Sequence, residues 1–147
     1  MNKVDQAVSC FKSGFSCSQA VLSAFGEELG LDKNVALKVS GAFGGGMAGM
    51  AQTCGAVTGA FMVIGLKYAK TKAEDEESKR KTYALVNDFV KCFKAKNSSI
   101  ICKELLGCDI STDAGKRNFK DKKLMDNLCT KFVQDAAEIV EEMLSDK

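Results

Sequence analysis

The chain has 147 residues with 21 basic and 19 acidic side chains, and it contains no histidine, proline or tryptophan. The missing histidine excludes Cys-His catalytic pairs, Ser-His-Asp triads, mixed Cys/His zinc sites and a c-type haem attachment motif, so no haem is expected. The small net charge, with both signs interspersed along the chain, argues against nucleic acid as a partner.

A chain of this length is expected to fold as one domain, residues 1–147. Its N-terminus lacks the charged-then-apolar pattern of a signal peptide, and its longest apolar stretch, 56–66, is about half a membrane span. We therefore expect a cytoplasmic protein without a membrane partner and with thiols that are reduced at rest. The seven cysteines are an odd number, which excludes complete disulfide pairing within one chain.

Apolar residues at helical spacing predict helices along the whole chain, and no segment shows convincing β alternation. The first helix ends near Gly14. Ser16 and Gln19 form a capping-box pattern for the second helix. Asp32 is expected to cap a third.

The glycine-rich segment 41–49 separates the third helix from a fourth, which is apolar on most sides and is therefore expected at the centre. This fourth helix is expected from Thr53 to about Ala69. Three more helices are predicted: a fifth with its apolar face at 85–93, a sixth at 100–106 capped by Ser98 or Ser99, and a last one from Asp121 to about Leu144. The sequence thus predicts an all-α fold, a compact bundle of about six to seven helices with a glycine-rich loop before the central helix.

Two cysteines follow hydroxyl residues that could cap helices: Cys17 follows Ser16, and Cys54 follows Thr53. Thiols in the first helical turn face unpaired N–H groups and the positive end of the helix dipole, which favour the thiolate. The thiolate is the form that attacks disulfides and binds soft metals. Cys17 and Cys54 are therefore the predicted catalytic thiols.

Helix order predicts which thiols meet. Short connections favour antiparallel neighbours, so the second and fourth helices should begin at one end of the bundle, which brings Cys17 and Cys54 together. The sixth helix should bring Cys102 towards that end, whereas the direction of the last helix, and with it Cys129, stays open. The other cysteines are expected to be small buried hydrophobic residues: Cys10, Cys92 and Cys108.

The segment 44–49 matches the pattern GxGxxG, but the segment before it looks helical, whereas a dinucleotide fingerprint requires a strand there. The glycines are better explained by a backbone that approaches another group closely at the start of the fourth helix than by dinucleotide binding. Its N–H groups could donate to sulfur or to an anion. The glycines expected at such a site are Gly45, Gly46, Gly49 and Gly55.

The spaced cysteines and the segment 54–59 resemble the redox-active family labelled C_GCAxxG_C_C, from about residue 15 to 144. Thr53 stands where the label has a glycine, and Gly55 separates Cys54 from Ala56. The resemblance implies a helical redox protein, and a similarity to the non-haem part of split-Soret cytochromes implies an iron–sulfur centre. The cysteines that would act together are Cys17, Cys54, Cys102 and Cys129.

We expect a cysteine-based redox protein that works in electron transfer or redox sensing. Four thiolates suit an iron–sulfur cluster, with zinc as the alternative metal, or switchable disulfides. Two other hypotheses are a thiol oxidoreductase with Cys54 as nucleophile and Cys17 as resolving thiol, and a non-redox binding or structural module that uses the glycine-rich loop. Expected partners are a redox partner protein or a small thiol or disulfide, with a homodimer left open.

Overall fold

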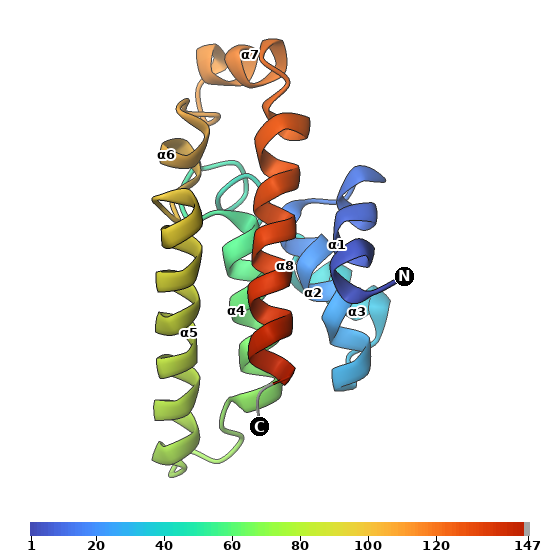
Figure 1. Cartoon of the computed structure of the whole chain (residues 1–147), viewed down its shortest axis with the longest axis vertical. Coiled ribbons are helices and arrows are strands. Elements are labelled where there is room, and N and C mark those ends of the chain that lie inside the picture. Colours follow the sequence, from blue (N-terminus) through green and yellow to red (C-terminus); the bar gives the residue numbers. More distant parts are fainter. Residues whose placement is uncertain (146–147) are drawn as a thin grey trace.

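The computed structural model describes residues 1–145, and these residues form an all-α fold (Figure 1). The prediction of an all-α chain is confirmed, although the described part holds eight α-helices where six to seven were expected. They are α1 (Lys3–Lys12), α2 (Cys17–Gly26), α3 (Lys33–Val39), α4 (Gly55–Tyr68), α5 (Glu76–Asn97), α6 (Cys102–Leu106), α7 (Asp113–Asp121) and α8 (Thr130–Ser145), with a 3₁₀ turn at Glu27–Leu29 and a π-helical segment at Met125–Cys129.

The additional helix, α7, lies in the segment that was expected to be a polar connector. Its surface is mostly charged, so the apolar periodicity that identifies a helix in the sequence is weak there. A capping signal is nevertheless present, because the side chain of Thr112 accepts a hydrogen bond of 2.9 Å from the N–H of Gly115. The single last helix expected from Asp121 is replaced by the end of α7, the π-helical segment and α8.

The central position predicted for the fourth helix is confirmed, because α4 contacts α2, α5 and α8 and is buried from residue 55 to 60. α2 and α4 run in the same direction and lie close together. A Cβ atom on Gly55 would stand 3.2 Å from the Cβ of Cys17, and one on Gly59 would stand 2.9 Å from the carbonyl oxygen of Ser18. Glycine therefore allows the two helices to approach at the end where both begin.

Two parts of the molecule differ in construction. The bundle consists of α1, α2, α4, α5 and α8, and α4, α5 and α8 follow the long axis in Figure 1. A row of phenylalanine rings joins these three helices at centroid distances of 5.9–6.2 Å: Phe61, Phe89, Phe93 and Phe132. The cap consists of residues 40–54 and 98–129 and covers one end of the bundle, where α6 and α7 lie.

The predicted helix caps are partly right. The capping box of Ser16 and Gln19 is present in full, and Asp32 accepts a hydrogen bond from Val35 as expected. Thr53 is not the cap of α4, which begins one residue later with Cys54 in the capping position. Ser98 instead ends α5 in a left-handed conformation.

None of the helices in residues 1–145 is long and apolar enough to cross a membrane.

Candidate functional site

Four cysteines line one cavity of about 390 Å³ where the cap meets the bundle. They come from the first turn of α2, the residue before α4, the start of α6 and the end of the π-helical segment: Cys17, Cys54, Cys102 and Cys129. Apolar side chains supply most of the remaining wall, including Phe11, Ile110, Phe119 and Phe132. The structure thus brings together the thiols that helix order predicted to meet, and it adds Cys129, whose position helix order left open.

The start of α2 is held from two sides, which fixes the position of Cys17. The capping box orders the first turn, in which the Gln19 side chain accepts a hydrogen bond of 3.0 Å from the N–H of Ser16. The hydroxyl of Ser18 donates to the carbonyl of Ser40 at 2.9 Å, so the same turn is tied to the end of α3. Buried polar groups such as the Ser18 hydroxyl keep their hydrogen-bond partners, because losing them is costly, so this turn and Cys17 within it are held in place.

Cys54 and Cys102 are held together by an antiparallel bridge between Thr53 and Ile101. The N–H of Cys54 donates to the carbonyl of Ile100 at 2.8 Å, and the N–H of Cys102 donates to that of Gln52. The sequence analysis missed this bridge, because a single bridge has no alternating pattern. It brings two cysteines 48 positions apart to the same wall of the cavity.

Gly46 leaves room for α6 beside the loop. Its φ of +70° lies in the left-handed region, and a Cβ there would stand 2.7 Å from the Cβ of Cys102 and 2.6 Å from the backbone nitrogen of Gln52. Gly45 and Gly55 also line the cavity, as predicted for a binding site. Gly49 is not among the residues that line the cavity, and a Cβ there would meet no atom within 4 Å, so its binding role stays a prediction.

The N–H groups of the loop are largely used within the loop itself. Those of Ala51 and Gln52 donate to the carbonyls of Gly45 and Gly46 at 3.0 and 2.8 Å. The N–H groups of 47, 49 and 50 also donate to carbonyls of residues 43–47. The carbonyls of the loop thus accept the hydrogen bonds of these N–H groups. The glycines of the loop contribute space and left-handed backbone angles beside the thiols.

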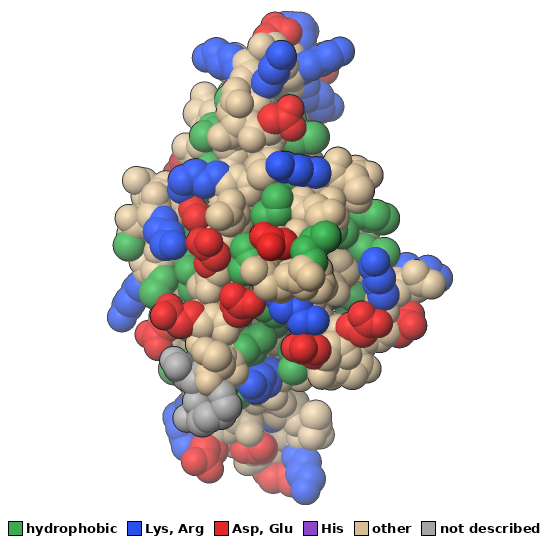
Figure 2. Space-filling model, turned by 45° about the vertical axis from the view of Figure 1, so that its right-hand side comes forward, with side chains coloured by type: hydrophobic (Ala, Val, Ile, Leu, Met, Phe, Trp, Pro, Cys, Tyr) green, Lys and Arg blue, Asp and Glu red, His purple; other side chains and the backbone are tan. Residues whose placement is uncertain are grey.

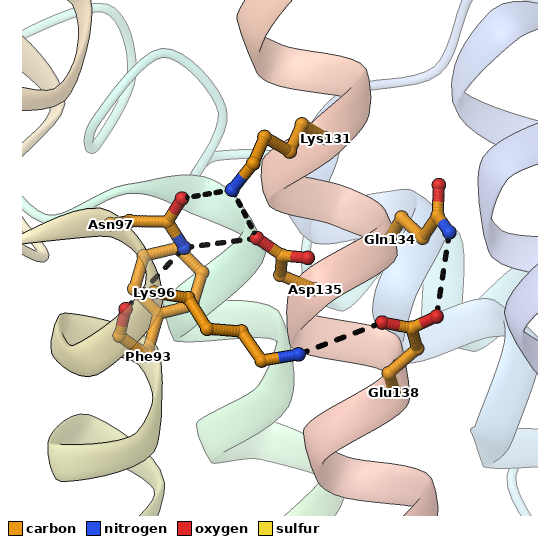
Figure 3. Close-up of polar contacts among 7 residues, drawn as sticks. All are labelled: Phe93, Lys96, Asn97, Lys131, Gln134, Asp135 and Glu138. Atoms are coloured by element: carbon orange, nitrogen blue, oxygen red, sulfur yellow. Dashed lines mark hydrogen bonds and ion pairs between the residues drawn. The ribbon is translucent and has the colours of Figure 1, made fainter.

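Cys129 owes its position to the π-helical segment and to a polar network directly after it. Figure 3 shows Asn97 at the end of α5 reaching Lys131 and Asp135 on α8. Asp135, which is buried, accepts from the amide of Asn97 at 3.1 Å and from the ammonium of Lys131 at 2.7 Å. This network joins the end of α5 to the start of α8, two residues after Cys129.

Cys17 and Cys129 form a hydrogen-bonded pair of thiols. The Cys17 thiol donates to the sulfur of Cys129, which raises the pKa of Cys17 well above its usual value and lowers the pKa of Cys129. Burial raises the pKa of Cys17 further. When this pair loses its first proton, the remaining proton is therefore shared between the two sulfur atoms.

The prediction that the helix starts make Cys17 and Cys54 thiolates is wrong. Burial raises the pKa of Cys54 to about 11, although the N–H groups of Ala56 and Val57 act in the opposite direction. These N–H groups lie close enough to favour the thiolate, but they make no full capping hydrogen bond. Burial likewise raises the pKa of Cys102 to about 12. Desolvation thus outweighs the helix terminus, and the reason for assigning Cys54 as nucleophile is removed.

The other three cysteines differ in their surroundings. Cys10 is half-buried outside the cavity, with its sulfur 3.7 Å from the hydroxyl of Ser23. Cys92 is exposed, so its predicted burial is wrong. Cys108 is half-buried and near enough to Cys102 to raise the pKa of that thiol, a proximity that the sequence analysis missed. All seven thiols are free of disulfide bonds.

The thiols surround a space instead of converging on a point. Within residues 1–145, no group of three or more Cys, Asp or Glu side chains is placed so that it could hold a metal ion. A cavity of about 390 Å³ is far larger than one ion. The arrangement offers four sulfur donors to a larger group, or two thiols in contact to an oxidant.

Comparison with known proteins gives one result. The sequence model of the family described as "Putative redox-active protein (C_GCAxxG_C_C)" matches residues 15–143, which include all four cysteines of the cavity. No curated protein and no solved structure matches the chain.

Proposed function

The chain belongs to the C_GCAxxG_C_C family of redox-active proteins, and we propose that its redox group is an iron–sulfur cluster held by Cys17, Cys54, Cys102 and Cys129. Its role would be electron transfer or redox sensing. The observation that carries the proposal is that these four thiols come from four separate segments and line one mostly apolar cavity.

The donor set and the space favour a cluster over zinc. All four candidate ligands are sulfur, and soft thiolates select zinc, copper(I) or iron–sulfur clusters. A structural zinc ion needs four ligands that converge within bonding distance of one point. The thiols here surround a volume of about 390 Å³, which suits a group of several atoms better.

The walls of the cavity also suit a redox group. Hydrogen bonds to the sulfur atoms and exclusion of solvent are two means by which a protein sets the potential of a cluster. The N–H groups of Ala56 and Val57 lie beside the Cys54 sulfur, and Phe119 and Phe132 cover the cavity. Because bound thiols must lose their protons, loading should release protons and improve as the pH rises.

The test is anaerobic purification followed by analysis of iron and acid-labile sulfide. We expect both elements in the unaltered protein and their loss in the Cys54→Ser variant. Cys92→Ser is the matched control, because Cys92 is exposed and lies outside the cavity, and it should retain both. Absence of iron and sulfide from a folded, anaerobically reconstituted protein would rule out the cluster.

One observation favours a second candidate, a thiol–disulfide switch between Cys17 and Cys129. These thiols are already hydrogen-bonded, and the Cys129 thiolate is the better nucleophile of the pair. Attack on a small disulfide would form a mixed disulfide, which the Cys17 thiolate then resolves, so that the substrate gains two electrons and two protons. Mass spectrometry of the oxidised protein should find a peptide linking Cys17 to Cys129. An oxidised protein in which both remain free would exclude the switch.

A further inference from the structure

The segment 116–123 concentrates the positive charge of the chain. It contains five basic residues and one acidic residue, whereas the rest of the chain has 16 basic and 18 acidic residues. The molecule outside this segment is thus slightly negative. We call the five side chains the basic ridge: Lys116, Arg117, Lys120, Lys122 and Lys123.

The basic ridge is exposed and lacks acidic partners. All five of its side chains are exposed. None takes part in an ion pair within residues 1–145, where the ion pairs involve Lys3, Lys70, Lys96 and Lys131. Figure 2 shows basic side chains gathered at the end of the molecule that α7 occupies. Like charges so close together repel one another, so the ridge does not stabilise the isolated chain.

The segment that carries the ridge also supplies part of the wall of the cysteine cavity. Phe119, on α7 between the basic residues, is part of the cavity wall. Met125, just after the ridge, lines the same cavity and is 51% exposed. Exposed cations therefore stand next in sequence to two apolar side chains of the cavity wall. A small interface with steering charges at its rim is typical of weak, rapidly exchanging redox complexes.

We propose that the basic ridge docks an acidic electron-carrier protein over the cysteine cavity. This inference rests on the proposed function, because it supplies the partner of the same site. One electron passes from the reduced carrier to the centre, which oxidises the carrier by one electron and moves no bond or proton. A protein is favoured over nucleic acid, because the cavity wall beside the ridge is mostly apolar, whereas duplex DNA presents a charged phosphate backbone.

The experiment measures binding of an acidic ferredoxin at low ionic strength by calorimetry. The test variant is K116E/R117E/K120E, and a milder variant changes the same residues to alanine, in case charge reversal disturbs α7. The matched control is K72E/R80E/K91E, which removes the same charge from exposed positions before α5 and along it. We expect at least about a tenfold loss of affinity in the test variant and less than about a twofold loss in the control.

Equal losses in the test and control variants would show a bulk charge effect and overturn the docking site. Binding of duplex DNA or anionic vesicles through the ridge, without binding of ferredoxin, would also overturn it. Repeating the titration with Cys54→Ser separates the two proposals. Binding by both the unaltered protein and Cys54→Ser, with no iron or sulfide in the unaltered protein, would sink the cluster and keep the docking site. An unaltered protein that holds iron and sulfide but binds no ferredoxin would sink only the docking site.

Discussion

The bundle and the cap are built on different physical grounds. In the bundle, small and aromatic side chains pack along regular helices, and α4 contacts its neighbours through Ala, Val and Gly. In the cap, positions are set by irregular backbone, as in left-handed residues, an isolated bridge and a π-helical segment. The cavity lies where the two meet. Regular packing thus supplies a rigid support, while irregular backbone places the four thiols around one space.

Gly46→Ala should have a large effect, because it crowds the contact between the loop and α6 beside two cavity cysteines. A Cβ there would meet Cys102 and the backbone of Gln52, and the left-handed φ adds further strain. We expect a loss of about 3 kcal/mol or more in urea unfolding. Gly49→Ala is the control: its φ of +79° is also left-handed but its surroundings are open, so about 1–2 kcal/mol is expected. Equal losses would show that strain alone matters.

The reduced, metal-free protein should lose stability in alkali. The folded state holds the pKa of Cys54 at about 11, above the usual value of 9.0. Between pH 9 and 11 the unfolded chain therefore gives up a proton that the folded chain keeps, which favours unfolding as the pH rises. The loss should reach about 2–3 kcal/mol, measured by urea unfolding at each pH. Cys54→Ala should make this profile less steep, although the raised pKa values of Cys17 and Cys102 keep part of the slope, and an unchanged profile would contradict the assignment.

Gly59→Ala tests the bundle in the same manner. A Cβ on Gly59 would stand 2.9 Å from the Ser18 carbonyl oxygen and 3.0 Å from the Cβ of Val21, so α2 and α4 must separate. We expect a loss of about 1–3 kcal/mol. Gly65, later in α4, has open space around it, and Gly65→Ala should stabilise the protein by up to about 1 kcal/mol through helix propensity. If both substitutions changed the free energy of unfolding in the same direction, the close approach of α2 to α4 at Gly59 would not explain the effect.

The smallest predicted effects compare two contacts between the same helices. Asp135→Ala leaves Asn97 and Lys131 without their shared acceptor and should cost about 1–2 kcal/mol. Lys96→Ala removes the exposed ion pair with Glu138, which spans 3.8 Å, and should cost less than about 0.5 kcal/mol. Thermal unfolding of both variants would measure the difference. A larger loss for Lys96→Ala would contradict the ranking.

The sequence predicted the bundle better than the cap. The apolar stretch 56–66 and the capping box at Ser16 reflect local physics, and both reappear in the structure. The meeting of Cys17 with Cys54 followed from helix direction. The Thr53–Ile101 bridge, by contrast, depends on contacts between distant segments that leave no local pattern.

Two features of the site were wrong or absent in the sequence analysis for the same reason. The thiolate prediction for Cys54 considered only the helix terminus, whereas its pKa is set mainly by burial among residues from other segments. Gly115 gave no signal as a contact either, although a Cβ there would clash with the carbonyl oxygen of Asp109. Both features depend on tertiary contacts with other segments, and these contacts cannot be identified from local patterns in the sequence.

The π-helical segment has a consequence for how the two parts are joined. Each residue of an α-helix turns the chain by about 100°, so the facing directions of distant side chains along one helix are locked together. The wider turn at Met125–Cys129, closed by the N–H of Thr130 donating to the Met125 carbonyl, contains one residue more. It shifts the rotational phase of the residues before it relative to α8, and Met125 and Cys129, at its two ends, both line the cavity. Deleting a single residue here would therefore leave both parts chemically intact and turn one against the other.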